Sequence, residues 1–345
     1  MLHWRLGLGI PLIGILTLLC WLDSQSPIPG LFLVPVFLVC VYFISREVLN
    51  LMNSGGLFPR RSTVYLGTIL MMTLCWMSCY RSLPYLRTSQ TTAYSYSGDY
   101  VAREASVVME TNSTITDDST QETTLNTENL FHFQNEEGWK TAALACVHTL
   151  LAMAAGVIIA FIGEMFRFKS PGGNTINLAG AIFAITYIGM LGCFMIMLRV
   201  AYGVGAVLSL IIVTKMCDIG AYTVGKLLGR HKMSPGLSPG KTVEGAVGGL
   251  IFAILGAWFT IDFLFPYWMN QQPNTSWTGL IIFGFFVGLT GMVGDLAESL
   301  IKRDVKRKDS GEGIPGFGGF LDLFDSLLLS APVAFGLWAF KVVQW

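Results

Sequence analysis

Long apolar runs recur along this chain, and they restrict its fold more than any other feature of the sequence. A helix needs roughly 17–25 predominantly apolar residues to cross a bilayer. Only 13% of the residues are charged, whereas a soluble domain carries about 25%. We therefore predict an all-α, polytopic integral membrane protein with about nine transmembrane helices. Their expected positions are 6–22, 31–45, 64–80, 141–164, 176–198, 203–217, 243–265, 278–297 and 324–343.

One polar stretch divides these segments into two groups. Residues 1–80 are predicted to form the N-terminal transmembrane helices, 81–140 an exoplasmic loop, and 141–345 a second transmembrane region. Within the loop, residues 88–129 hold 16 Ser or Thr, seven acids and a single base, Arg103. So few apolar residues cannot form a core, and we expect a flexible segment. The net charge of zero gives no reason to expect a nucleic-acid partner.

The distribution of Lys and Arg predicts the orientation. With nine spans and the N-terminus inside, 15 basic residues fall in inside loops and six in outside loops, with Lys215 within a span. The six assigned to the outside are Arg81, Arg87, Arg103, Lys140, Arg199 and Lys341. An excess of basic residues in short loops marks the cytoplasmic side. The polar motifs described next are therefore expected to face the cytoplasm.

The first polar motif is "CDIGAYTVGKLLGRHKMSPGLSPGKTVEG", residues 217–245. Asp218 ends an apolar helix, with Lys215 three residues earlier on the same face. The run 238–242, SPGKT, leads into the next helix. Glycine, a helix N-terminus and Lys241 together favour a bound phosphate. The spacing is not that of a Walker A loop, and an ordinary basic inside loop is the alternative.

The second polar motif begins inside an apolar span. Positions 295, 298, 299 and 302 are spaced so that their side chains form one stripe on a helix, and they carry Asp295, Glu298, Ser299 and Lys302. Ionisable residues at such depth are costly and mark functional sites. A basic cluster and the turn "GIPGFGGF" follow, and then Asp322 and Asp325 lie at the head of the last helix.

These carboxylates have two readings. Oxygen ligands from two helices beside a cationic loop could hold a hard cation such as magnesium, which suits a nucleoside triphosphate. Alternatively, Asp322 and Asp325 cap the last helix, where Asp is favoured. A cation-coupled transporter would also place carboxylates in helices, but near the bilayer midplane and often in repeated halves. Here they lie at helix ends, and the sequence shows no internal repeat.

The stretch "SLIKRDVKRKDSGEGIPGFGGFLDLFD", residues 299–325, resembles the signature of the phosphatidate cytidylyltransferases, the CDP-diacylglycerol synthases. That signature runs S-x-hydrophobic-K-R, four residues, K-D, a small-residue turn, H-G-G and D-R-x-D. The motif at 217–245 is similar to the family's cytoplasmic segment. The likeness is good over roughly residues 180–345 and weak at "WRLGLGIPLIGI" and "REVLNLM".

The resemblance implies a magnesium-dependent nucleotidyltransferase that converts CTP and phosphatidic acid to CDP-diacylglycerol and pyrophosphate. It implies catalytic residues Lys302, Arg303, Lys308 and Asp309. Residues that shape the CTP site would be Asp218, Ser238, Lys241, Thr242 and Glu244. Asp295 and Asp322 would bind magnesium, with Asp325 and Glu298 in support. We also expect a homodimer in a bacterial inner membrane with a cytoplasmic active site, and a monovalent cation such as potassium is a candidate second ion.

Two positions depart from the signature. Phe317 stands where the family has histidine, and Leu323 stands where it has arginine. Losing a cation and a polar turn residue beside the aspartates leaves a second function open, that of a catalytically weak or inactive membrane homologue with a regulatory role. The retained lysines and carboxylates favour the active enzyme.

Overall fold

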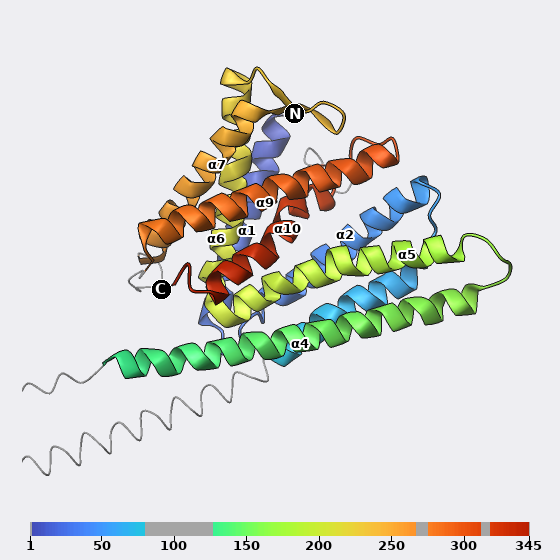
Figure 1. Ribbon diagram of the computed structural model, residues 1–345, viewed down its shortest axis with the longest axis horizontal. Coiled ribbons are helices and arrows are strands. Elements are labelled where there is room, and N and C mark those ends of the chain that lie inside the picture. Colours follow the sequence, from blue (N-terminus) through green and yellow to red (C-terminus); the bar gives the residue numbers. More distant parts are fainter. Residues whose placement is uncertain (1, 80–126, 267–274, 312–317, 345) are drawn as a thin grey trace, which may run out of the picture.

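The computed structural model describes residues 2–79, 127–266, 275–311 and 318–344. Helices dominate this part of the chain (Figure 1), in line with the predicted all-α membrane protein. The predicted loop at 88–129 lies almost entirely outside the described residues, and Phe317 lies outside them too. The helices are α1 (Leu2–Gln25), α2 (Leu33–Ser54), α4 (Thr127–Arg167), α5 (Asn174–Ala184), α6 (Leu191–Leu228), α7 (Val243–Trp258), α9 (Trp277–Asp304) and α10 (Leu321–Ala339), with π-helical turns at Ile185–Met190 and Phe259–Leu264.

Seven helices in the described residues are long and apolar enough to cross a membrane. They include a further helix, Arg61–Cys79, and they count residues 174–228 as one continuous candidate. This count does not confirm the predicted nine. Two of the predicted segments, 176–198 and 203–217, fall in that single candidate, although its backbone breaks at Gly203, where φ is 86° and ψ is 178°. Only glycine adopts this conformation without steric cost, so the sequence permits a sharp change of direction there.

The second half of the chain forms a closely packed group of helices. In it α6 packs mainly on α7 and α10, and α9 packs on α10 and α7. Small residues allow this close approach, as they do in many membrane helix pairs. At Gly294 of α9, an added Cβ would lie 2.5 Å from the carbonyl oxygen of Asp325 in α10. The two helices that carry most of the predicted metal ligands are therefore in backbone contact.

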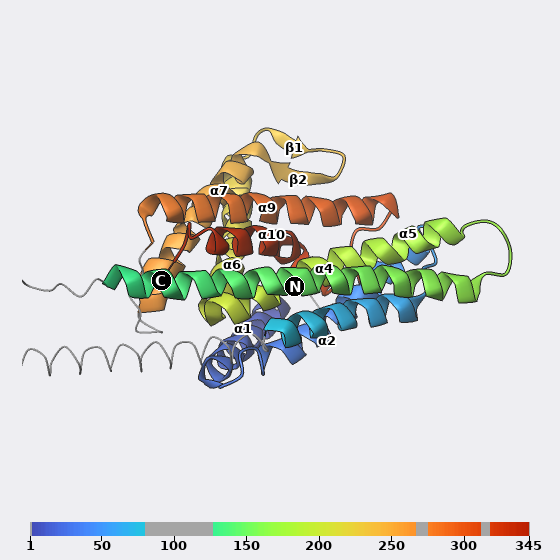
Figure 2. The ribbon, with the colours of Figure 1, turned by 60° about the horizontal axis from the view of Figure 1, so that its bottom comes forward.

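A short β-hairpin departs from the purely helical expectation. Strands β1 (Lys232–Ser234) and β2 (Ser238–Thr242) pair antiparallel, with Lys232 opposite Thr242 and Ser234 opposite Ser238. The hairpin stands above α9 in Figure 2, beyond the start of α7. The guanidinium of Arg303, at the end of α9, donates to the carbonyl oxygen of Leu237 over 3.2 Å. The SPGKT run therefore forms a strand, and the neighbouring Leu237 ties it to α9. The sequence analysis predicted a glycine-containing loop here and not a strand.

Three connections that were assigned to the same side of the membrane meet at one end of the molecule. The Phe58 amide donates to Asn177 Oδ1 over 2.7 Å, joining the 55–60 connection to the start of α5. Glu47 of α2 accepts from the Phe320 and Leu321 amides at the start of α10, over 2.9 and 2.8 Å. These bonds agree with one shared face for the predicted inside loops.

A buried ion pair fixes α1 to α6. Arg199, assigned to an outside loop, is 8% exposed and bonds both to the carboxylate of Asp23 and to its carbonyl oxygen. Asp23 is fully buried and also accepts from the amides of Gly30 and Phe32. Arg199 is therefore a structural cation inside the protein, and its loop assignment does not hold for the side chain.

Removing one member of this pair should destabilise the protein. Arg199→Met leaves the Asp23 charge buried without its cation, which typically costs about 3–5 kcal/mol. We expect a lower thermal unfolding temperature in detergent. The double variant Asp23→Asn/Arg199→Met removes both charges and should recover much of the loss. Equal unfolding temperatures for wild type and Arg199→Met would contradict the buried pair.

Candidate functional site

The predicted metal-ligand carboxylates lie on α9 and α10. Carboxylate oxygens of Asp295, Glu298 and Asp325 all lie within 4.8 Å of one another. Asp295 is partly exposed, whereas Glu298 and Asp325 are 1% and 5% exposed. One turn of α9 separates the first two, and the backbone contact at Gly294 brings Asp325 to them. The structure thus joins three of the four predicted ligands in one carboxylate cluster.

The carboxylate cluster fits a hard divalent cation. Carboxylate oxygens are ligands that magnesium and other hard cations prefer, and three carboxylate side chains meet here within 4.8 Å of one another. Glu298 Oε1 is buried and has no hydrogen-bond partner in the described part of the chain. Buried polar atoms normally have a hydrogen-bond partner or a metal ion beside them, so this oxygen is a candidate metal ligand.

Asp322 has a different environment. Its Oδ1 accepts from Lys302 Nζ over 2.7 Å, and its Oδ2 accepts from the Ser310 hydroxyl over 2.9 Å and the Gly319 amide over 2.7 Å. The bond to Gly319 N ties the first turn of α10 to the segment before it, but it is not a helix cap, because the N-cap residue of α10 is Phe320 and no side chain caps it. The structure therefore groups Asp295 with Asp325 and Glu298, while Asp322 faces Lys302.

Lys302 joins the two helices. Its ammonium lies 2.7 Å from Glu298 Oε2 and 2.7 Å from Asp322 Oδ1, and its side chain is 12% exposed. The stripe predicted on α9 explains the i, i+4 contact with Glu298, whereas the contact with Asp322 depends on how α10 packs. Lys302 thus places one positive charge between two carboxylates of the protein.

The other predicted phosphate-binding residues lie near the hairpin and beyond α9. Lys241 Nζ is 2.7 Å from Asp295 Oδ2, which links β2 to the carboxylate cluster. Lys308 and Asp309 are exposed in the turn after α9. Arg303 holds the hairpin through Leu237, as described above, and donates to the Arg307 carbonyl over 3.3 Å.

Of the remaining predicted residues of the CTP site, Ser238, Thr242 and Glu244 lie at the hairpin and the start of α7. Asp218, expected at the end of an apolar helix, lies inside α6, which continues to Leu228. Thr242 caps α7 by accepting from the Gly245 amide over 3.1 Å. Glu244 accepts from His231 Nδ1 over 2.6 Å and from the Arg230 amide over 3.1 Å, closing the base of the hairpin. Ser238 begins β2. Asp218 is paired with Lys215 over 3.2 Å, as their i, i+3 spacing predicts.

Sequence reasoning missed Glu47 as a site residue. Besides the amides of Phe320 and Leu321, it accepts from the Ser310 hydroxyl over 3.2 Å, and it is 7% exposed. It therefore satisfies the first amides of α10, a task that helix ends require. The available signal was an acid inside the apolar run "VYFISREVLNLM", because intramembrane acids mark functional or structural sites.

The fold and this site define a polytopic membrane protein whose helix ends gather carboxylates and cations on one face. The chain belongs to the cytidylyltransferase family, whose family model matches residues 4–340. It is 34% identical over 213 residues to a phosphatidate cytidylyltransferase of Bacillus subtilis, covering 61% of this chain and 72% of that protein. The Synechocystis enzyme of the same name is 44% identical over 122 residues, 34% of this chain and 38% of that protein. The one from Mycobacterium bovis is 32% identical over 208 residues, 57% of this chain and 65% of that protein.

Removing the Glu47 carboxylate should destabilise the start of α10. Glu47→Ala leaves the Phe320 and Leu321 amides without their acceptor, whereas the Ser310 hydroxyl keeps Asp322 as its acceptor. Each lost acceptor costs about 1–3 kcal/mol in a buried position. We expect a net loss of about 3 kcal/mol, given partial relaxation. Thermal unfolding in detergent measures it. The exposed neighbour Arg46→Ala should change stability by less than about 0.5 kcal/mol, and a similar drop in both variants would show that Glu47 does not hold α10.

Proposed function

We propose that this protein is a phosphatidate cytidylyltransferase, which transfers the cytidylyl group of CTP to phosphatidic acid. Membership of the cytidylyltransferase family and the names of its relatives support this activity. The observation that carries it is the carboxylate cluster beside Lys241, in which Glu298 also has a buried oxygen without a hydrogen-bond partner among the described residues. Cations and metal-ligand oxygens together suit a substrate that brings several phosphates.

The reaction needs no nucleophile from the protein. A phosphate oxygen of phosphatidic acid forms a bond to the α-phosphorus of CTP, and the bond to the β-phosphate oxygen breaks, so pyrophosphate leaves with its electron pair. The residues contribute position and charge. Lys241, at the end of β2, would contact the triphosphate, and the exposed Lys308 would do so from the turn after α9. Arg303 would place the hairpin through its bond to Leu237.

We assign Asp295, Glu298 and Asp325 as the ligands of a magnesium ion. When bound there, the ion would neutralise charge on the triphosphate and polarise a phosphoryl oxygen. Lys302 and Asp322 would support this set: Lys302 fixes Glu298 by its 2.7 Å contact, and Asp322 fixes Lys302. A second, monovalent cation and a homodimer stay predictions of the family resemblance.

We further propose that the site faces the cytoplasm of a bacterial inner membrane. The excess of Lys and Arg in the predicted inside loops supports this orientation, and the bacterial sources of the relatives described above support the assignment to a bacterial membrane. Nine spans would follow if α1 crosses the bilayer and if 174–202 and 203–228 cross separately around Gly203.

Leu323, partly buried in α10, stands where the family signature has arginine. This replacement removes a cation beside the site but none of the three proposed metal ligands.

Activity should depend on a divalent cation. Purified protein in detergent, given labelled CTP and phosphatidic acid, should form CDP-diacylglycerol with magnesium or manganese and stop in excess chelator. Magnesium should also raise the thermal unfolding temperature, because a ligand that binds only the folded state stabilises it. Undiminished product in chelator would refute the metal site. No product with any metal would favour the regulatory homologue.

Neutral substitutions should separate ligands from structural acids. Asp295→Asn and Asp325→Asn keep the shape but remove the charge, and we expect turnover to fall by a factor of 100 or more, on the order of 3 kcal/mol of transition-state stabilisation. Both should also lose the magnesium-dependent rise in unfolding temperature. The exposed Asp304→Asn, at the end of α9, is the matched control and should keep both properties. A normal rate in Asp325→Asn would exclude Asp325 as a ligand.

A further inference from the structure

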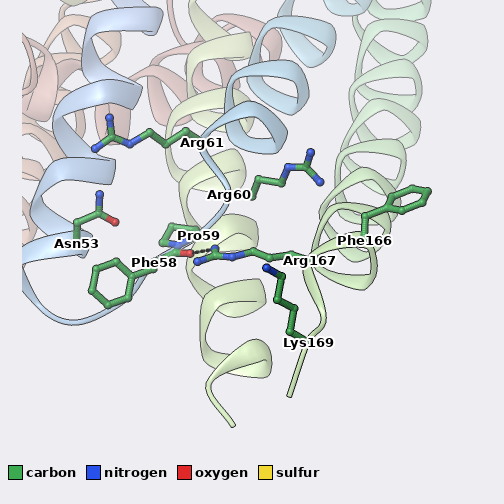
Figure 3. Close-up of a pocket in the computed structure, with 8 residues that line it drawn as sticks. All are labelled: Asn53, Phe58, Pro59, Arg60, Arg61, Phe166, Arg167 and Lys169. Carbon is green, nitrogen blue, oxygen red and sulfur yellow. Dashed lines mark hydrogen bonds between the residues drawn. The ribbon is translucent and has the colours of Figure 1, made fainter. Parts of the chain in front are cut away.

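A second cationic feature lies away from the carboxylate cluster. A cleft of about 560 Å³ opens where the connection after α2 meets the end of α4 (Figure 3). It is lined by Asn53, Phe58, Pro59, Arg60, Arg61, Phe166, Arg167 and Lys169. Four of these eight residues are cations and none is an acid, so the cleft is strongly positive.

The arginines of this cleft are held in place. Arg60 donates to the Gly163 carbonyl over 3.3 Å, Arg61 to Asn50 Oδ1 over 3.1 Å, and Arg167 to the Phe58 carbonyl. Figure 3 shows the Lys169 ammonium directed toward Arg167, although like charges repel. The nearest paired acid is Glu164, 4.0 Å from Arg167. It balances one cation at most, which leaves about three positive charges facing the cleft.

The rim of the cleft is apolar and lies at the boundary of two candidate spans. Cys146–Arg167 ends here and Arg61–Cys79 begins here. Phe58 is 51% exposed and Phe166 is 83% exposed. Exposed phenyl rings at the ends of two candidate spans favour contact with lipid over contact with water, and the lipid phosphates lie at the same boundary. The positive charge of the cleft and its position at the ends of two spans therefore both suit the phosphate of a membrane lipid.

We propose that this cleft binds the phosphate headgroup of an acidic phospholipid of the surrounding membrane. Basic pockets between helices at the cytoplasmic side bind such headgroups, and arginine matches a phosphate with paired donors. This lipid site is separate from the substrate site, and its occupation does not depend on cytidylyl transfer. Helix α2 connects the lipid site to the substrate site. Asn53 at the cleft follows Glu47, which holds the start of α10, by six residues, about 9 Å along a helix.

The test uses a lipid that is not the proposed substrate. Full-length protein in neutral detergent is titrated with dioctanoyl phosphatidylglycerol, and bound lipid is measured by native mass spectrometry. Arg167→Gln/Lys169→Gln should bind it about tenfold or more weakly, since each basic residue near an anionic headgroup contributes measurably. Lys169→Gln alone should weaken binding less and leaves the Arg167 bond to Phe58 intact. Lys341→Gln, beyond the far end of α10, should bind as the wild type does.

Three results would overturn the lipid site. They are unchanged affinity in both cleft variants, equal binding of zwitterionic dioctanoyl phosphatidylcholine, and equal weakening in Lys341→Gln. Displacement of the lipid by an equal concentration of inorganic phosphate would assign the cleft to a free anion instead. Unfolding temperature and CDP-diacylglycerol formation are measured on each variant, so that a folding defect or a failed proposed activity is told apart from lost lipid binding.

Discussion

The contact of Lys302 with both Glu298 and Asp322 is the interaction on which the site depends. Carboxylates inside a membrane protein are costly unless paired, and these two belong to different helices. One ammonium between them makes the approach of α9 and α10 favourable where two bare acids would repel. The backbone contact at Gly294 then becomes possible, and it brings Asp325 beside Asp295. Removing one partner of a buried pair leaves an uncompensated charge, so packing and site geometry are coupled here.

The acids near the start of α10 fall into two groups with different tasks. Glu47 and Asp322 have their oxygens taken up by amides, hydroxyls and Lys302, so they hold the frame. Asp295, Asp325 and Glu298 lie close together with fewer partners: Lys241 contacts Asp295, the Ser326 amide donates to Asp325, and Glu298 Oε1 has no hydrogen-bond partner among the described residues. A fully paired acid has no free oxygen for a metal, whereas a partly paired cluster has several. On the proposed assignment, this division would account for a structural aspartate, Asp322, and a metal-ligand aspartate, Asp325, within one sequence signature.

Most of the membrane spans and several side-chain pairs of the site could be predicted from the sequence. The contacts that could not be predicted share one physical reason. Apolar length gave most of the spans, and helical periodicity placed Asp295, Glu298 and Lys302 on one stripe and Lys215 beside Asp218, because these relations are local. Three features depend on segments far apart in the chain: the Glu47 bonds to α10, the partner set of Asp322, and the burial of Arg199 against Asp23. Periodicity carries no information about such contacts. The count of nine spans stays a prediction, because the predicted segments 176–198 and 203–217 form one long apolar candidate whose backbone breaks at Gly203.

The depth of the charged groups argues against the transporter reading and for chemistry at the membrane surface. A transported ion must reach carboxylates near the midplane from both sides, whereas here the carboxylates lie near the end of α9 and the start of α10, under the β1–β2 hairpin. An enzyme that joins a water-soluble nucleoside triphosphate to a lipid phosphate would need cations near the membrane surface, because one substrate arrives from water and the other stays in the leaflet. Lys308 is exposed to water, whereas Lys241 Nζ is buried against Asp295, and the cleft at Arg60 and Arg167 lies at the ends of two candidate spans. The cations of this protein therefore lie at distinct places with distinct partners, which a loop that served orientation alone would not require.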